Sequence, residues 1–374
     1  MDIVIREVKN RREMRTFIHL PAKIHKNHKN WLPPIYIDEW KYFNPKKNKC
    51  FLYSDTKLLM AFKHGKAVGR IMGIINNRYN QHHGEMHARF GYLECWNDQE
   101  VAHALISSIE QWAKSFKMVK LIGPYGFSDK DPQGFLIEGF EHKPLMVSAS
   151  NPEYMIRLVE NEGFTKEIDC LAYKFALTKP LPDIYFRVAK RVQGNSAYTL
   201  HEFTDKKHLE PYLIPSLKIM NEAFEDIYGF DQMDEREMME LAKRYMPVLD
   251  PSFVKAISVN NQVIAFMVAL PNLTPGLQKA RGRLFPFGLF QLLKAAKETK
   301  QLDLMLGGID KRYRGLGLDA VMATKLIETA KKKGFEVIAI HLMLETNKRV
   351  LGEMVKAGAT LIKRFRIYQK GLTD

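Results

Sequence analysis

The segment Asp303-Leu-Met-Leu-Gly-Gly-Ile-Asp-Lys-Arg-Tyr-Arg-Gly-Leu-Gly-Leu318 joins a short apolar strand to a glycine loop. Gly307 and Gly308 interrupt the strand, which indicates a bulge or the close approach of a ligand. The periodicity predicts an amphipathic helix directly after the loop, over 319–333. A strand, a glycine loop and a helix in this order aim backbone N–H groups and the positive end of a helix dipole at one anion. The sequence therefore predicts a phosphate-binding loop at 314–318, to which Arg314 and Lys311 add positive charge.

Two well-known phosphate motifs do not describe this loop. A dinucleotide fold places its glycines early in a βαβ unit, with an acidic residue about 20 positions later, whereas this loop follows at least three predicted strands. The loop also lacks the Lys-Ser/Thr ending of a nucleotide-binding P-loop.

Internal similarity organises the rest of the chain. The predicted strand around Val68 recurs around Val263, 195 residues later. The helix that begins at Asn151 recurs at Asn347, 196 residues later. Because two unlike features share nearly one offset, we interpret the chain as a duplicated α/β domain.

The order of predicted elements supports the duplication. Each half runs strand, strand, long helix, short apolar strand and asparagine-started helix. The long helices and the strands after them are predicted at 100–116, 119–122, 319–333 and 337–340. A proline-marked boundary then predicts domains at 1–182 and 183–374. Insertions differ, at about 125–150 in the first half and 273–299 in the second.

Composition narrows the class of protein. The chain has 374 residues, 46% apolar and 26% charged, as expected for globular domains. The start of the sequence does not resemble a signal peptide, and three cysteines without CxxC spacing favour a reducing compartment over a zinc site, so we expect a cytoplasmic protein without a metal. A net charge of +15 fits a nucleic acid, an anionic membrane or a phosphorylated small molecule.

The pattern around the loop resembles the GNAT acyltransferase superfamily. The family's phosphate motif, R/Q-x-x-G-x-G/A, matches Arg314-x-x-Gly317-x-Asp319 at its first two positions, and a shifted register over 312–317 matches all the letters. Asn347 and Gly358 resemble the family's later helix, and Asn151 resembles it in the first half. The resemblance implies an α/β (α+β) fold of two tandem GNAT-like domains, each a mixed, largely antiparallel sheet flanked by helices.

The resemblance also implies a site in the second domain. The implied donor is acetyl-CoA or a longer acyl-CoA, and an amine acceptor attacks its thioester while a carboxylate or a water removes the proton. Asp303 is the first candidate for this base, with Glu345 and His341 as the others. The implied acyl-CoA-binding residues are Leu306, Gly307, Ile309, Arg314, Gly315, Leu316, Gly317, Leu318 and Asn347.

Some positions depart from the family pattern. Asp319 replaces a small residue beside the phosphates, and Met354 stands where many members have a tyrosine. The corresponding loop of the first half, 95–100, has no glycine and two carboxylates, so we expect a first domain without the cofactor.

Three functions remain open from the sequence. The leading one is an acyl-CoA-dependent N-acyltransferase acting on an unidentified amine, with a lipid-like amine as one branch of this hypothesis. The alternatives are a CoA-binding or interaction protein that has lost catalysis, and a tRNA-dependent peptidyltransferase. The charged helical-hairpin arm typical of the last class is missing from the sequence, and we do not expect nucleic acid as a partner. The segment 279–297, apolar in its middle and basic at both ends, suggests contact with a membrane or an acyl chain.

Overall fold

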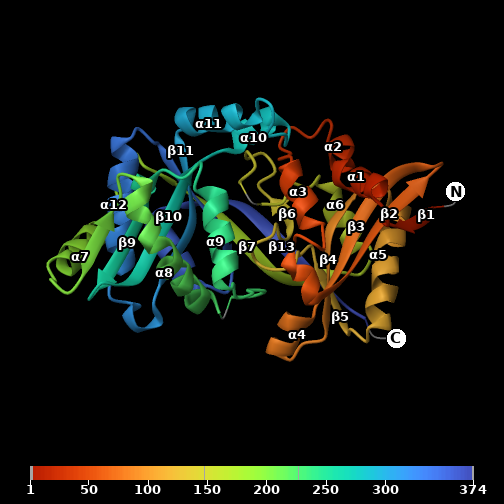
Figure 1. Cartoon of the computed structure of the whole chain (residues 1–374), viewed down its shortest axis with the longest axis horizontal. Helices are drawn as coiled ribbons and strands as arrows, with labels where there is room; N and C mark the ends of the chain where they lie inside the picture. The colour runs from red at the N-terminus through yellow and green to blue at the C-terminus, as the bar shows by residue number, and fades with distance from the viewer. Residues whose placement is uncertain (1–2, 147, 226, 373–374) are drawn as a thin grey trace. The chain divides into compact units, whose positions relative to one another are not determined.

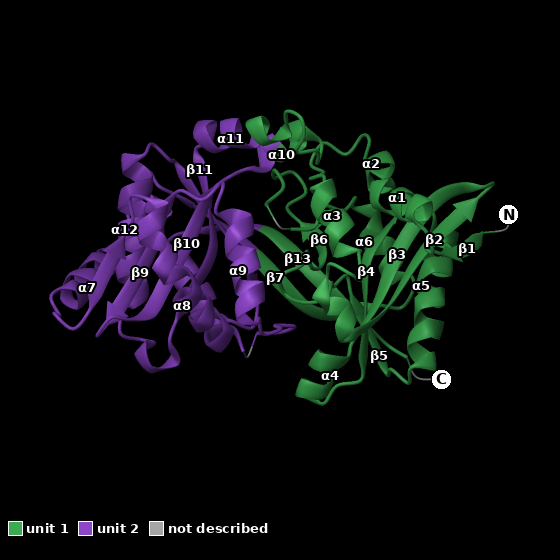
Figure 2. Ribbon diagram, viewed as in Figure 1, with its two compact units in different colours: residues 1–171, 277–291, 363–374 green, residues 172–276, 292–362 purple. Residues whose placement is uncertain are grey.

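The computed structural model describes residues 3–146, 148–225 and 227–372. It divides into two compact units, shown in Figure 2. Unit 1 comprises residues 1–171, 277–291 and 363–374, and unit 2 comprises residues 172–276 and 292–362. Both compact units are discontinuous in sequence. The domains predicted at 1–182 and 183–374 describe the sequence repeat and stay a prediction.

Unit 1 is a mixed sheet with helices on both faces. Its strand order is β1-β2-β3-β4-β5-β13, with β6 also pairing β13. Only β4 and β5 pair in parallel among these strands of the described chain, and the other pairs are antiparallel. The strands are β1 Val4–Glu7, β2 Ser54–Lys63, β3 Lys66–Asn76, β4 His87–Cys95, β5 Lys120–Gly123, β6 Phe135–Glu138 and β13 Thr360–Gly371.

The sheet of unit 1 separates two hydrophobic cores, and helices cover both. The long helix α5 packs on one face of the sheet through Leu105, Ile109 and its other apolar residues. On the other face, Phe17 of α1 and Phe43 at the end of α3 pack against β2 and β3. The helices are α1 Arg11–His19, α2 Pro21–Ile24, α3 Tyr36–Tyr42, α4 Asn77–His83, α5 Gln99–Ser115, α6 Tyr154–Glu160 and, shared with unit 2, α10 Thr274–Ala280 and α11 Gly288–Glu298.

Unit 2 repeats this plan with the strand order β7-β12-β11-β10-β9-β8. Here β11 and β12 are the parallel pair, and β8, β9, β10 and β11 pair antiparallel in turn. The strands are β7 Thr165–Ala176, β8 Thr199–Glu202, β9 Val254–Val259, β10 Gln262–Pro271, β11 Gln301–Ile309 and β12 Val337–Leu344. The helices are α7 Asp183–Gln193, α8 Lys206–Phe224, α9 Glu235–Tyr245, α12 Leu318–Lys332 and α13 Lys348–Lys356 (Figure 1).

The predicted duplication of a mixed α/β domain is confirmed. The two long helices, α5 and α12, each begin and end one residue before the predicted bounds. One helix start is wrong: α6 begins at Tyr154, because Asn151 turns its side chain to the backbone N–H and C=O of Leu136, at 2.7 and 3.2 Å.

Two strands come from the half of the sequence opposite to that of their neighbours: β13 beside β5, and β7, whose residues 172–176 belong to unit 2, beside β12. In unit 1, the C-terminal strand β13 pairs with β5 from Tyr368↔Gly123 to Gly371↔Lys120. In unit 2, β7 occupies the place beside β12. Tyr368 and Leu372 lie in the core on which α5 packs, so the C-terminal segment is part of the folded body of unit 1.

Within the parts of the chain that the structure describes, none of the helices combines the length and the hydrophobicity needed to cross a bilayer.

Candidate functional site

In unit 2, the parallel strands β11 and β12 pair only at their beginnings. The pairing runs from Gln301↔Val337 to Leu304↔Ile340, while β11 continues along β10 as far as Ile309. The pairing of β10 with β11 shifts register between Val268 and Ala269, at the point where β11 stops pairing with β12. The backbone of β11 from Leu306 to Ile309 therefore lies beyond the paired region, where the sequence predicts the pantetheine arm of an acyl-CoA.

The glycine pair in β11 has unequal roles. A Cβ on Gly308 would lie 2.8 Å from the Phe266 ring, which is closer than real contacts allow. A Cβ on Gly307 would meet the Phe266 carbonyl oxygen at 3.6 Å, an ordinary contact. Packing therefore explains Gly308 but not Gly307, whose role in ligand binding stays a prediction.

A buried acid–base pair lies where the two strands part. The Oδ1 atom of Asp303 on β11 is 3.6 Å from Nε2 of His341 on β12, and both side chains are almost fully buried. Asp303 Oδ1 also accepts a hydrogen bond of 2.7 Å from Gln301. Within the described part of the chain, Asp303 Oδ2 and both ring nitrogens of His341 are buried without a hydrogen-bond partner. Such unmatched groups are costly unless a ligand or a water satisfies them, so this pair is a functional candidate.

The alternation of side chains along β11 and β12 shows on which face of the sheet each residue lies. Leu302, Leu304 and Ile338 pack in the core that includes Leu326 and Ala330 of α12. Successive side chains of a strand point to opposite faces. Asp303 and His341 therefore face away from α12, on the side of the sheet opposite that core.

The predicted phosphate loop has the backbone that its glycines suggest. Gly315 and Gly317 have φ of +82° and +89°, in the left-handed region that other residues avoid. A Cβ on Gly317 would lie 2.3 Å from Val188 of α7. Gly317 is the N-cap of α12 and provides no capping side chain, so the first N–H groups of α12 are not capped by a side chain and can take an anion.

Basic side chains around the loop bond to the protein itself. Arg314 donates to the carbonyl oxygens of Ile309, at 3.3 Å, and Ala223, at 3.1 Å. Lys311 pairs with Glu225 at 3.0 Å. We infer that the backbone, more than these side chains, forms the anion site.

The other predicted site residues lie farther along unit 2. Asn347 caps α13 by accepting from the Val350 N–H at 3.3 Å. Glu345 is half-buried and directly follows β12. Leu316 of the loop is exposed, whereas the Leu318 side chain is in the core and only its backbone can serve a ligand. The acyl-CoA-binding assignments of these residues stay predictions.

The corresponding helix in unit 1 is closed to an anion. Asp98 caps α5 by accepting from the N–H groups of Glu100 and Val101, at 3.1 and 3.2 Å. Lys63 pairs with the same carboxylate at 2.5 Å. A carboxylate thus already occupies the position that a phosphate would take.

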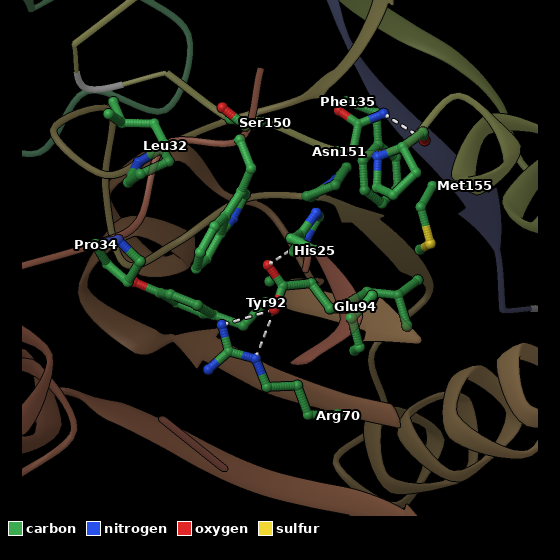
Figure 3. A pocket seen from close by; sticks show the side chains of 18 of the residues that line it. His25, Leu32, Pro34, Arg70, Tyr92, Glu94, Phe135, Ser150, Asn151 and Met155 are labelled. Atoms are coloured by element: carbon green, nitrogen blue, oxygen red, sulfur yellow. Dashed lines mark hydrogen bonds and ion pairs between the residues drawn. The ribbon is translucent and has the colours of Figure 1, made fainter. Parts of the chain in front are cut away.

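Unit 1 nevertheless holds a cavity of about 150 Å³ on the opposite face of its sheet. We call it the unit 1 cavity. Figure 3 shows side chains converging on it from the N-terminal segment, from β4 and from the loop before α6. Its walls are largely apolar, formed among others by Trp31, Leu32, Pro34, Tyr92, Phe135 and Met155. Pro124, Gly126, Pro132 and Gly134 of the first insertion also line it.

A linked set of charged groups lies in the unit 1 cavity. Nε and Nη2 of Arg70 each lie 2.9 Å from Oε2 of Glu94, and Nη1 donates to the Phe17 carbonyl oxygen at 2.8 Å. Oε1 of Glu94 faces Nε2 of His25 at 3.6 Å (Figure 3). Burial opposes the charge of Glu94, but Arg70 and His25 lower its pKa below the ordinary value. Glu94 is therefore ionised at neutral pH.

A second carboxyl in the unit 1 cavity behaves differently. Oε2 of Glu39 is buried without a hydrogen-bond partner, and burial raises the pKa of Glu39 to about 7. His25 stacks on Trp31 with ring centroids 5.1 Å apart, and its Nδ1 lies 3.0 Å from Nδ1 of His28. Burial, with His25 and Lys363 nearby, lowers the pKa of His28 to about 4. His28 is thus neutral at physiological pH.

The sequence did not single out the charged residues of the unit 1 cavity. His25, Glu39, Arg70 and Glu94 are dispersed over four elements, and none stands in a recognisable motif. The available signal was the insertion at about 125–150, because long loops often carry binding residues.

Two curated relatives align with almost the whole chain. A bacterial ceramide synthase of Caulobacter vibrioides (strain NA1000 / CB15N) is 28% identical over 378 residues, covering 99% of this chain and 98% of the relative. Protein YghO of Escherichia coli (strain K12) is 26% identical, covering 98% and 95%. No family model matches the chain.

Solved structures establish the fold. A tandem GNAT protein from the clavulanic acid biosynthesis pathway superposes with a TM-score of 0.56 at 10% identity, covering 100% of this chain and 99% of that one. A GCN5-related N-acetyltransferase from Sphaerobacter thermophilus gives 0.52 at 11% identity, covering 100% and 96%. The predicted tandem GNAT fold is confirmed.

Proposed function

We propose that the protein is an acyl-CoA-dependent N-acyltransferase whose acceptor is a long-chain amino base. The observation that carries the proposal is the Asp303–His341 pair, buried with unmatched polar atoms where β11 and β12 part. The tandem GNAT fold and the uncapped start of α12 beside that point support an acyl-CoA as the donor.

In the proposed complex, the loop 314–318 and the first turn of α12 hold the diphosphate of the acyl-CoA. The left-handed backbone at Gly315 and Gly317 fits this role, because it turns N–H groups outward without a Cβ in the way. Leu306, Gly307 and Ile309 offer backbone groups to the pantetheine arm, and Asn347 is assigned a place beside the same arm. Asp319 is exposed in the first turn of α12, so its carboxylate can stay in solvent.

The chemistry is direct attack of the amine nitrogen on the thioester carbonyl carbon. A C–N bond forms, the C–S bond breaks, the amine proton goes to His341, and the thiolate leaves and takes a proton from solvent. Asp303 faces Nε2 of His341, so Nδ1 is the nitrogen that receives the proton, and Asp303 stabilises the resulting imidazolium. Asp303 thereby acts as a positioning residue. Glu345 remains the alternative base from the sequence.

Two observations favour a lipid-like acceptor. The relative from Caulobacter is named a ceramide synthase, and a ceramide is the amide of a fatty acid and a long-chain amino base. In the 279–297 segment, Phe285 and Phe287 are each 74% exposed and Phe290 is 64% exposed. Lys279, Arg281 and Arg283 are exposed just before them. We propose that this aromatic and basic segment contacts an anionic membrane surface from which the substrates are taken.

Thiol release by the full-length protein tests the proposal. Acetyl-CoA and a C16 acyl-CoA are each incubated with a long-chain amino base, with hexylamine and without amine, and the amide is identified by mass. We expect release with the long-chain pair that requires both substrates. If CoA raises the melting temperature but no thiol is released, the catalytic proposal fails in favour of a CoA-binding protein. Amide formation that requires aminoacyl-tRNA would favour a peptidyltransferase instead.

A further inference from the structure

We propose that the unit 1 cavity binds the primary ammonium head of an apolar molecule between Glu39 and Glu94. The inference goes beyond the proposed function and does not identify that molecule with the amine acceptor. Binding itself requires no acyl-CoA.

The cavity presents acceptors that lack donors. Among the described residues, Oε2 of Glu39 is buried without a hydrogen-bond partner, and Oε1 of Glu94 lies 3.6 Å from His25 Nε2, which is beyond hydrogen-bond distance. His25 Nε2 is itself buried and unpartnered. An ammonium brings three N–H donors and a positive charge, which match two carboxyl oxygens and one imidazole nitrogen.

The three guanidinium nitrogens of Arg70, which lines the unit 1 cavity, each already have an acceptor. Arg70 directs Nε and Nη2 to Oε2 of Glu94 and Nη1 to the Phe17 carbonyl oxygen. Its guanidinium is also held over the Phe17 ring, 4.9 Å from the centroid. An anionic ligand would therefore meet two carboxyls beside a guanidinium that is already paired with Glu94, so the charge distribution favours a cation.

The walls and the size select the rest of the molecule. Trp31, Leu32, Phe135 and Met155 provide apolar surface around the charged set. A volume of about 150 Å³ is similar to that of a cavity that takes a benzene-sized molecule. The unit 1 cavity thus has room for the head and the first few carbons of an alkyl amine.

Two neighbouring histidines lie beside the proposed ammonium site. His25 Nε2 faces the charged set, and its Nδ1 contacts His28 Nδ1 at 3.0 Å. His28 is half-buried, so the pair connects the unit 1 cavity to a less enclosed position.

Calorimetric titration of the full-length protein with hexylamine and hexanol, without CoA, tests the inference. We expect hexylamine to bind at least ten times more tightly than hexanol. Glu39→Gln and Glu94→Gln should each weaken hexylamine binding at least tenfold and leave hexanol unchanged. Glu141→Gln, a matched change of a carboxylate that is 73% exposed in unit 1, should change neither.

Two further measurements test amine binding independently of the Arg70–Glu94 ion pair. Glu39→Gln leaves the Arg70–Glu94 ion pair intact, so a folding defect in Glu94→Gln does not decide the result. The fluorescence of Trp31, which stacks on His25, should change with hexylamine, and Trp31→Phe should remove that change. Equal affinities for the amine and the alcohol, or wild-type affinity in both glutamine variants, would overturn the inference. If the protein binds no amine in this assay but still releases thiol, the proposed function stands and only the inference about the unit 1 cavity fails.

Discussion

Asp303 and His341 face each other at 3.6 Å across two parallel strands that separate immediately beyond them. The pair combines three properties that seldom coincide in a purely structural contact. It is deeply buried, it leaves polar atoms unmatched, and it lies where the backbone pairing of the sheet opens. Its substitution therefore gives the most direct test of the proposed chemistry.

His341→Ala should lower kcat for acyl transfer by ~100-fold or more, because a positioned base contributes about that factor. Asp303→Asn should also lower kcat, since it removes the group that orients the imidazole. The KM for acyl-CoA should change little in either variant, because neither side chain is assigned to donor binding. Steady-state thiol release measures both constants.

His208→Ala is the matched control, because His208 is an exposed histidine of the same unit. Its kcat should equal that of the wild type. Full turnover by His341→Ala, combined with loss of turnover in Glu345→Gln, would transfer the role of base to Glu345.

Gly317→Ala should destabilise unit 2 and raise the KM for acyl-CoA. The left-handed backbone alone costs a non-glycine residue about 1–2 kcal/mol, and the new Cβ would also collide with Val188. Gly352→Ala in α13 is the matched change, with nothing within 4 Å of the added carbon. It should raise stability by about 0.5–1 kcal/mol, as expected for alanine in a helix. Thermal unfolding and donor titrations measure both variants, and an unchanged KM in Gly317→Ala would contradict the loop assignment.

Glu39→Gln should raise the melting temperature at pH 8 and leave it nearly unchanged at pH 5. Burial raises the pKa of Glu39 from 4.5 to about 7, so the folded protein holds a proton that the unfolded chain has already released. Below the unfolded value both states are protonated and the group costs nothing. As pH rises from about 4.5 to about 7 the folded state loses stability, by at most about 3 kcal/mol. Glutamine remains neutral and should remove this loss, so equal melting temperatures at pH 8 would contradict the raised pKa.

The triple change Phe285→Ser, Phe287→Ser and Phe290→Ser should weaken binding to anionic vesicles at least ~10-fold, because burying each ring is worth about 1.5–3 kcal/mol. Co-sedimentation with phosphatidylserine vesicles at two salt concentrations measures this binding. Higher salt should also weaken it, through the basic residues before the rings. Phe116→Ser, at an exposed ring elsewhere on unit 1, should have no effect. Equal loss in both variants would show that the 279–297 segment has no special role.

The fold could be predicted because duplication leaves its mark on the sequence. The recurrence of Val68 at Val263 identified the central strands, and Gly315 and Gly317 identified a loop that only glycines can form. The exchanged last strands could not be predicted, since strands pair through backbone groups that every residue carries. The unit 1 cavity was missed for another reason. His25, Glu39, Arg70 and Glu94 become exceptional only through burial beside one another, and burial depends on the tertiary structure.

The exchanged strands have a consequence for biosynthesis. The sheet of unit 1 includes β13, which is synthesised after all the other strands of both units, whereas β1 to β6 have been synthesised by Glu138. Until then, β5 presents an unpaired edge, the kind of surface through which nascent chains aggregate. A gene fragment ending at residue 182 would lack this strand permanently. The chain thus delays completion of its first unit until the strands of the second have been synthesised, and loss of residues 360–371 would damage the unit encoded first.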